Sequence, residues 1–226
     1  MPDPAEMLAN NRNWAKAVSD RDPEFFQRLA EQQKPDCLWI GCSDSRVPAT
    51  QIVDVPPGEI FVHRNVANQV IHSDLNCQSV IQFAVDVLKV KHIVICGHYR
   101  CGGIIAAAEN QRHGLVDHWL HNLVDLFEAH RADLAAVTDD RKRDQLQSEL
   151  GVIQQVSNVA TTTTLRDAWS RGQAVSIHGW VYDVADGLVR DLKVTIEPDS
   201  DESAITRQAI ASAIARPSQT DGREPG

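Results

Sequence analysis

The sequence has no segment typical of an export signal or a membrane span. Its first residues, Met1 to Glu6, lack the basic stretch and apolar core of a signal peptide. No apolar run approaches the roughly 20 residues that a membrane-spanning helix needs. We therefore expect a cytoplasmic protein without a membrane partner.

Clustered positive charge is also missing. The 22 Lys and Arg residues are outnumbered by 31 Asp and Glu residues, which gives a formal net charge of −9. Proteins that bind nucleic acids need Lys and Arg gathered on one surface to neutralise phosphates. The composition therefore argues against a nucleic-acid partner and favours a small molecule.

Several cysteine and glycine motifs are absent too. The chain has an odd number of cysteines and no C-x-x-C pair. No arginine stands about five residues after Cys101, as a phosphatase loop requires, and no G-x-G-x-x-G fingerprint of a dinucleotide site follows the first predicted strand. In a cytoplasmic chain, such thiols are buried or bind metals more often than they form disulfides. The cysteines are Cys37, Cys42, Cys77, Cys96 and Cys101.

The sequence does contain alternating strand and helix patterns, which predict an α/β fold. Apolar runs at 36–40, 59–63 and 92–96 predict strands, and residues 74–90 have helical spacing. A strand, a helix and a strand in that order form the unit of a mainly parallel β-sheet, whose buried strands are continuously apolar. Flanking helices are predicted at 104–110, 117–135 and 140–168.

Two additions extend this core. Helical spacing before the first strand predicts an N-terminal helical arm over residues 1–34. Strand patterns on either side of Asp186-Gly187 predict a C-terminal hairpin, and a last helix follows it. We expect a single α/β domain over 35–216 and a flexible tail over 217–226.

Polar and charged side chains collect where two of the predicted strands end. Cys42, Asp44 and Arg46 follow the first strand, and His98 and Cys101 follow the strand at 92–96. Open α/β sheets build their sites at the carboxyl ends of their strands. We therefore expect Cys42, His98 and Cys101 to meet at one edge of the sheet, with Asp44 and Arg46 at the end of the first strand.

Cys42, His98 and Cys101 have the composition of a zinc site. Two thiolates and one imidazole suit zinc, and three protein ligands leave a fourth position open, as in catalytic sites. Taken singly, each residue is more often a buried thiol or a loop histidine with satisfied hydrogen bonds. Glycines on both sides of the His98 and Cys101 pair indicate a tight turn at a site. Together these features favour Zn2+ as the cofactor.

Asp44 has three alternative roles. Paired with Arg46, it stays ionised and can orient a water molecule on the metal. Bound to the metal, it would block the open position, so it is a metal ligand in a closed state only. The third alternative is an ordinary surface salt bridge, which contributes under about 1 kcal/mol.

Three motifs together resemble the β-class carbonic anhydrases. They are Cys42-Ser-Asp-Ser-Arg46, His63-Arg-Asn-Val-Ala-Asn68 and Gly97-His98-x-x-Cys101, in that order. The resemblance implies a zinc enzyme that reversibly hydrates CO2 to bicarbonate and a proton. It also implies that the two cysteines and His98 hold the zinc and that Asp44 and Arg46 form the catalytic pair.

The resemblance further implies substrate contacts and an assembly. Gln33 matches an amide that reaches the substrate from a neighbouring subunit, and the Gly102 N–H helps to bind the substrate. Phe61, Val66 and Phe83 would wall an apolar CO2 pocket, although a role in the core fits each equally well. Family members are dimers or dimers of dimers, so we expect a homo-oligomer, specifically a tetramer.

A subset of the family has a second, non-catalytic bicarbonate site. Trp39, Gly41, Arg64 and Tyr182 match its tryptophan, small residue, arginine and tyrosine. In that subset, bicarbonate or low pH favours the closed state, which predicts allosteric inhibition through Asp44. Taken singly, Trp39 fits the core, Arg64 an ion pair and Tyr182 a strand surface equally well.

Two other functions remain open at this point. A hydrolase of CS2 or COS would keep the same fold and zinc site. A non-catalytic protein that responds to bicarbonate or zinc would be expected if the Asp44 and Arg46 pair were missing. The intact pair favours the enzyme.

Overall fold

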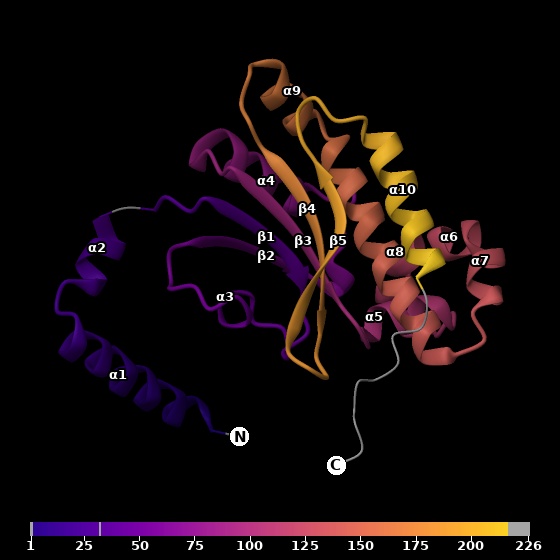
Figure 1. The fold of residues 1–226 in the computed structure, drawn as a ribbon. Helices are drawn as coiled ribbons and strands as arrows, with labels where there is room; N and C mark the ends of the chain where they lie inside the picture. Colours follow the sequence, from indigo (N-terminus) through magenta and orange to yellow (C-terminus); the bar gives the residue numbers. More distant parts are fainter. Residues whose placement is uncertain (1, 32, 217–226) are drawn as a thin grey trace, which may run out of the picture.

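A computed structural model describes residues 2–31 and 33–216 (Figure 1). Its centre is a five-stranded sheet in the order β2-β1-β3-β4-β5. Neighbouring strands are parallel from β2 to β4, and β5 is antiparallel to β4. The predicted α/β fold with a C-terminal hairpin is therefore confirmed. The strands are β1 (Cys37–Cys42), β2 (Ile60–Asn65), β3 (His92–His98), β4 (Ser176–Asp183) and β5 (Leu188–Ile196).

The two central strands are the most apolar, as a sheet covered on both faces requires. In β1 all residues after Cys37 are buried, and in β3 all residues after His92 are buried. By contrast, β4 alternates strictly between buried and half-buried residues. Its two faces therefore have unequal cover.

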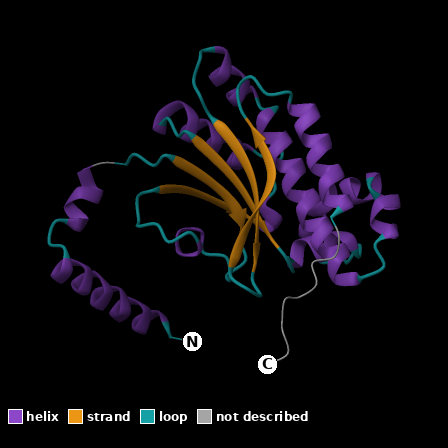
Figure 2. Ribbon diagram, in the orientation of Figure 1, coloured by secondary structure: helices purple, strands orange, loops and turns teal. Residues whose placement is uncertain are grey.

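Most helices cover one face of the sheet and form the main core with it (Figure 2). The longest is α8 (Asp140–Ala160), whose buried stripe includes Leu146, Leu150 and Ile153. Gly97 and Gly179 let α8 approach the sheet closely, because neither has a side chain. A Cβ at Gly97 would lie 2.6 Å from a Val152 methyl carbon. The other helices of this core are α4 (Leu75–Gln82), α5 (Gly102–Ala108), α6 (Leu115–Ala129), α7 (Arg131–Ala136), α9 (Thr163–Ser170) and α10 (Glu202–Ala215).

The opposite face has a smaller core under the short helix α3 (Ala49–Ile52). Trp39 is 1% exposed there and meets Trp180 edge-on, with 6.0 Å between ring centroids. Val94 and Cys96 of β3 complete this cluster. This face of the sheet therefore carries a pair of aromatic rings, one from β1 and one from β4.

The structure divides three helices that the sequence pattern predicted as continuous. The segment 140–168 is α8 followed by α9, because Thr162 caps a new helix by accepting a hydrogen bond from the Leu165 N–H. The segment 117–135 falls in α6 and α7, and 74–90 is α4 followed by a π-helical turn, Phe83–Leu88. Apolar spacing persists across each break because both parts face the same core, so the breaks were not visible in the pattern.

The N-terminal arm consists of α1 (Pro4–Arg21) and α2 (Phe25–Glu31), which lie away from the sheet (Figure 1). A capping box at Asp3 and Glu6 begins α1. Trp14 packs edge-on against Phe26, with 5.6 Å between ring centroids, but it remains 47% exposed. The tail predicted over 217–226 lies outside the described residues. None of the helices in the described ranges is both long and apolar enough to span a bilayer.

Stability should depend on pH through a histidine of the less covered face. Burial is the main cause that lowers the pKa of His178 from 6.5, and neighbouring His92 adds to it. Its ring contacts His92 at 3.1 Å and Thr195 at 3.2 Å. Because the folded state keeps His178 neutral, the unfolded state binds the extra proton as the pH falls below about 6.5, and stability is lost.

We expect the free energy of unfolding, measured in urea, to fall between pH 7 and pH 5. His178→Gln should lose less stability over this range than the unaltered chain. His113→Gln, which changes an exposed histidine, is the matched control and should keep the full dependence. Equal pH slopes for the two variants would contradict the assignment.

Candidate active site

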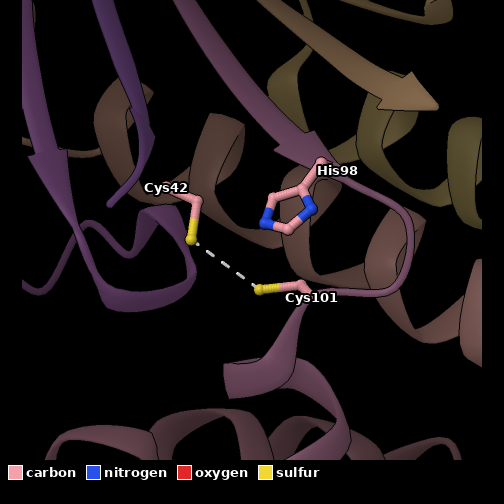
Figure 3. A group of neighbouring side chains, drawn as sticks. All are labelled: Cys42, His98 and Cys101. Carbon is pink, nitrogen blue, oxygen red and sulfur yellow. Dashed lines mark hydrogen bonds between the residues drawn. The ribbon is translucent and has the colours of Figure 1, made fainter. Parts of the chain in front are cut away.

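Three potential metal ligands meet at the carboxyl edge of the sheet (Figure 3). Cys42 ends β1, His98 ends β3, and Cys101 immediately precedes α5. All three residues are buried, and their ligand atoms lie within 4.8 Å of one another. The predicted cluster is therefore assembled, and it joins two strands that are far apart in the sequence.

Strand pairing explains why the three residues meet. β1 and β3 are parallel neighbours, with Cys37 opposite His92 and Gly41 opposite Cys96, so both strands end at the same edge. The chain then turns back at Arg100, whose φ of 59° is left-handed and uncommon for a residue with a side chain. This turn brings Cys101 under His98.

The orientation of the His98 ring fits a metal ligand. Its Nδ1 donates to the carbonyl oxygen of Tyr99 at 3.1 Å, which leaves Nε2 as the unprotonated nitrogen. Nε2 is buried and has no hydrogen-bond partner among the described residues. A buried polar atom without a partner is costly, and a metal ion at this position would satisfy it.

The two thiols also fit a cation. Their sulfur atoms are 3.8 Å apart. Donation from Cys101 is the main cause that lowers the pKa of Cys42, whereas the adjacent Cys42 and burial raise the pKa of Cys101. The protein groups alone thus favour the thiolate form of only one cysteine. A divalent cation would supply the charge that stabilises the second thiolate. Two sulfurs and one nitrogen suit tetrahedral zinc with its fourth position free.

Asp44 lies beside this cluster in a two-pronged pair with Arg46. Arg46 Nε donates to Oδ1 at 2.9 Å and Nη2 donates to Oδ2 at 2.7 Å. Arg46 also anchors the turn by donating to the Arg100 carbonyl oxygen at 3.2 Å. The hydrogen bonds from Arg46 to Asp44 hold the pKa of Asp44 well below its usual range, so its carboxylate is ionised. Of the arrangements that the sequence left open, the structure contains the one in which Asp44 pairs with Arg46.

The paired carboxylate nevertheless remains close to the potential metal ligands. Asp44 Oδ2 is 3.7 Å from His98 Nε2. Arg64 supports the same segment from β2 by donating to the carbonyl oxygens of Cys42 and Asp44. Two arginines therefore fix the loop after β1, one through the Asp44 side chain and one through the main chain.

The residues predicted for a second anion site gather near this loop. Gly41 lies against Trp39, because a Cβ there would come within 2.6 Å of the indole Nε1. Tyr182 is half-buried in the small core that contains Trp39, and it lies opposite His98 in the pairing of β3 and β4. Arg64 donates to main-chain oxygens, and among the described residues it has no ion pair.

The predicted substrate contacts are spread more widely. Phe61 and Phe83 stack at 5.9 Å between ring centroids, and Val66 and Phe83 are 39% and 43% exposed. Gly102 begins α5 and faces open space. Gln33 is exposed and precedes the amino end of β1, opposite the end that carries Cys42. Within one chain, Gln33 is therefore not brought to the ligands.

His63, Asp74 and Cys77 form another group whose ligand atoms lie within 4.8 Å of one another. Its surroundings do not favour a metal. The Asn65 amide is fixed by two bonds to the Gln69 main chain, and its remaining N–H points to His63 Nε2 at 3.3 Å. Burial raises the pKa of Cys77 to about 12, so the thiol keeps its proton.

The fold and the site together define a class. A Cys-His-Cys cluster next to an ionised carboxylate held by an arginine has the composition expected of the site of a metal-dependent α/β enzyme.

Comparison with known proteins defines the class further. The family model described as carbonic anhydrase matches residues 37–189. A carbonic anhydrase from Emericella nidulans is 42% identical over 208 residues, covering 86% of this chain and 91% of the relative. A tetrameric β-carbonic anhydrase from Sordaria macrospora has a TM-score of 0.80 at 41% identity, covering 84% of this chain and 96% of that one. A Coccomyxa β-carbonic anhydrase, solved with acetazolamide, has a TM-score of 0.82 at 36% identity, covering 90% and 96%.

The chain belongs to the β-carbonic anhydrase family. Members of this family are zinc enzymes that hydrate CO2. The predicted enzyme class is confirmed.

The metal site can be tested by composition. We expect the purified protein to contain about one zinc per chain, because three ligands converge on one point. Cys42→Ser should lose most of that zinc, since it replaces a thiolate ligand. Elemental analysis after gel filtration measures the content. Cys37→Ser is the control, because it makes the same chemical change at a cysteine outside the cluster. An equal zinc content in both variants would contradict the site.

Proposed function

We propose that this chain hydrates CO2 reversibly to bicarbonate and a proton, with zinc held by Cys42, His98 and Cys101. The observation that carries the proposal is the position of Asp44, which Arg46 holds beside the ligand cluster, with Oδ2 3.7 Å from His98 Nε2. An ordinary surface salt bridge has no reason to occupy this place. The arrangement of Asp44 and Arg46 beside the cluster thus fits a catalytic role.

Each residue has a defined task in this proposal. Zinc, when bound, lowers the pKa of a coordinated water to about 7 and so makes a nucleophile available near neutral pH. Asp44 accepts a hydrogen bond from the attacking oxygen and turns its lone pair toward CO2. Arg46 keeps Asp44 ionised and restricts its rotation.

The substrate would sit between apolar and polar groups. Phe61, Val66 and Phe83 line the apolar side, where a small nonpolar molecule replaces water at little cost. Gly102 is the first residue of α5, and its N–H donates to a substrate oxygen. The helix dipole also favours a negatively charged oxygen at this position. Gln33 would come from a neighbouring subunit.

Asp44→Asn tests the role of the carboxylate. The amide can still reach Arg46 with one oxygen, but it no longer accepts two hydrogen bonds there or orients the nucleophile. We expect kcat/KM for CO2 hydration to fall roughly 100-fold in a stopped-flow assay, with zinc retained. Asp36→Asn is the matched control, because Asp36 forms an exposed ion pair with Lys91.

An unchanged rate in Asp44→Asn would count against the proposed role. A wild-type protein that hydrolyses CS2 but does not hydrate CO2 would contradict the proposed substrate.

We further propose that bicarbonate and low pH inhibit the enzyme by moving Asp44 from Arg46 to the metal. The distance that Asp44 must travel is short, as its 3.7 Å separation from His98 indicates. Arg64 supports a link to a second anion site, because it holds the Cys42 and Asp44 carbonyl oxygens. An anion bound near Trp39, Gly41 and Tyr182 would compete for this guanidinium and loosen the loop.

Gly41→Ala tests this regulation with a small change. The added methyl group would crowd the Trp39 indole and fill the space for an anion. We expect the bicarbonate concentration for half-inhibition to rise roughly tenfold. Tyr182→Phe should shift it in the same direction. Inhibition by bicarbonate that is identical in both variants and in the unaltered chain would refute the second site.

We also propose that the protein is a cytoplasmic homo-oligomer, with a tetramer as the specific state. The exposed apolar side chains of the arm, Met7, Leu8 and Trp14, support this assembly, because an isolated chain would leave them in water. The structural relative from Sordaria macrospora is itself tetrameric.

A further inference from the structure

Helix α8 holds both residues that separate His98 from Cys101. Tyr99 donates from its hydroxyl to Glu149 Oε1 at 2.6 Å. Arg100 donates from its main-chain N–H to Asp144 Oδ2 at 3.2 Å. Two carboxylates on one helix therefore fix the short loop between two metal ligands.

Tyr99 transmits this restraint to the His98 ring. Its carbonyl oxygen accepts the hydrogen bond from His98 Nδ1, and its N–H donates to the Tyr182 carbonyl oxygen at 3.0 Å. The Tyr99 side chain is only 5% exposed, so it has little freedom to move. A shift of Tyr99 would displace the acceptor that directs His98 Nε2 toward the ligand cluster.

Glu149 is a buried group that the proposed reaction does not use. It is 4% exposed, and Arg216 Nη1 donates to the same Oε1 at 2.7 Å. Burial raises the pKa of Glu149, whereas Tyr99 and Arg216 oppose that rise. An ionisable group is kept in such a place only when it is paired, and Arg216 at the end of α10 provides the countercharge.

We propose that Glu149 is a positioning residue for the metal site. It holds the Tyr99 hydroxyl and thereby fixes the carbonyl oxygen that orients His98. Partners of metal-bound histidines typically change metal affinity 10- to 100-fold when they are lost. Glu149 acts one step further out, through the Tyr99 backbone, and Arg216 connects the C-terminal helix to the same chain of contacts.

The test is the rate at which the zinc-loaded protein releases its metal to a chelator. Glu149→Leu removes the acceptor, and Tyr99→Phe removes only the donor hydroxyl. We expect both to release zinc roughly 10-fold faster or more than the unaltered protein. Glu149→Gln keeps an oxygen for Tyr99 and should restore a rate within a few-fold of the original. In the cobalt-substituted protein, the visible absorption bands should shift in the first two variants only.

Leu150→Ala separates positioning from general loss of stability. Leu150 is the next residue of α8, is 1% exposed, and offers no hydrogen-bonding group. Its replacement should lower the melting temperature while leaving zinc release and the cobalt spectrum unchanged. Faster release from Leu150→Ala than from Tyr99→Phe would overturn the proposal.

The double variant Tyr99→Phe/Glu149→Leu completes the test. If Glu149 acts through Tyr99, the double variant should release zinc about as fast as the faster single variant. Multiplied effects would instead assign Glu149 an independent role and overturn the proposal.

The inference rests on the zinc site of the proposed function. A wild-type protein without zinc would overturn that function. Unchanged zinc release in Tyr99→Phe and Glu149→Leu would overturn this inference alone.

Discussion

The parallel pairing of β1 with β3 is the constraint on which the site depends. It places the last residue of each strand at the same edge, so Cys42 and His98 meet although the sequence separates them widely. Both strands are central in the sheet, as their continuously apolar and buried sequences require. Helix α8 packs closely on β3 and β4 because Gly97 and Gly179 have no side chains. A one-residue slip in this pairing would turn each side chain of the strand to the opposite face and so separate the ligands.

The cluster of two cysteines and His98 and the pairing of Asp44 with Arg46 were predictable because their signals are local. Cys42, Asp44 and Arg46 fall within five positions, His98 and Cys101 within four, and the strand patterns place both groups at one edge. The breaks between α6 and α7 and between α8 and α9 were missed, since apolar spacing continues through them. No local pattern links Tyr99 to Glu149 or Arg100 to Asp144, because those contacts exist only after α8 packs on the sheet.

Charge around the loop after β1 is balanced by two arginines with different partners. Arg46 holds the Asp44 carboxylate, whereas Arg64 holds main-chain oxygens. Hydrogen bonds to charged groups are each worth about 1.5–3 kcal/mol, so Asp44 leaves Arg46 only if another interaction replaces them. In the proposed regulation, a bound cation would supply that interaction, and an anion on Arg64 would weaken the loop that opposes the movement.

Two clusters within residues 2–31 and 33–216 bring histidine, cysteine and carboxylate groups close together, and their neighbours distinguish them. At His98 the Tyr99 carbonyl oxygen takes the Nδ1 proton and leaves Nε2 without a partner. At His63 the fixed Asn65 amide occupies Nε2, so a neutral ring carries its proton on Nδ1. A metal there would have to displace Asn65 from Nε2 or bind an imidazolate through Nδ1. Proximity of donor atoms is therefore insufficient for a metal site, and the hydrogen bond on the far nitrogen decides which cluster can bind one.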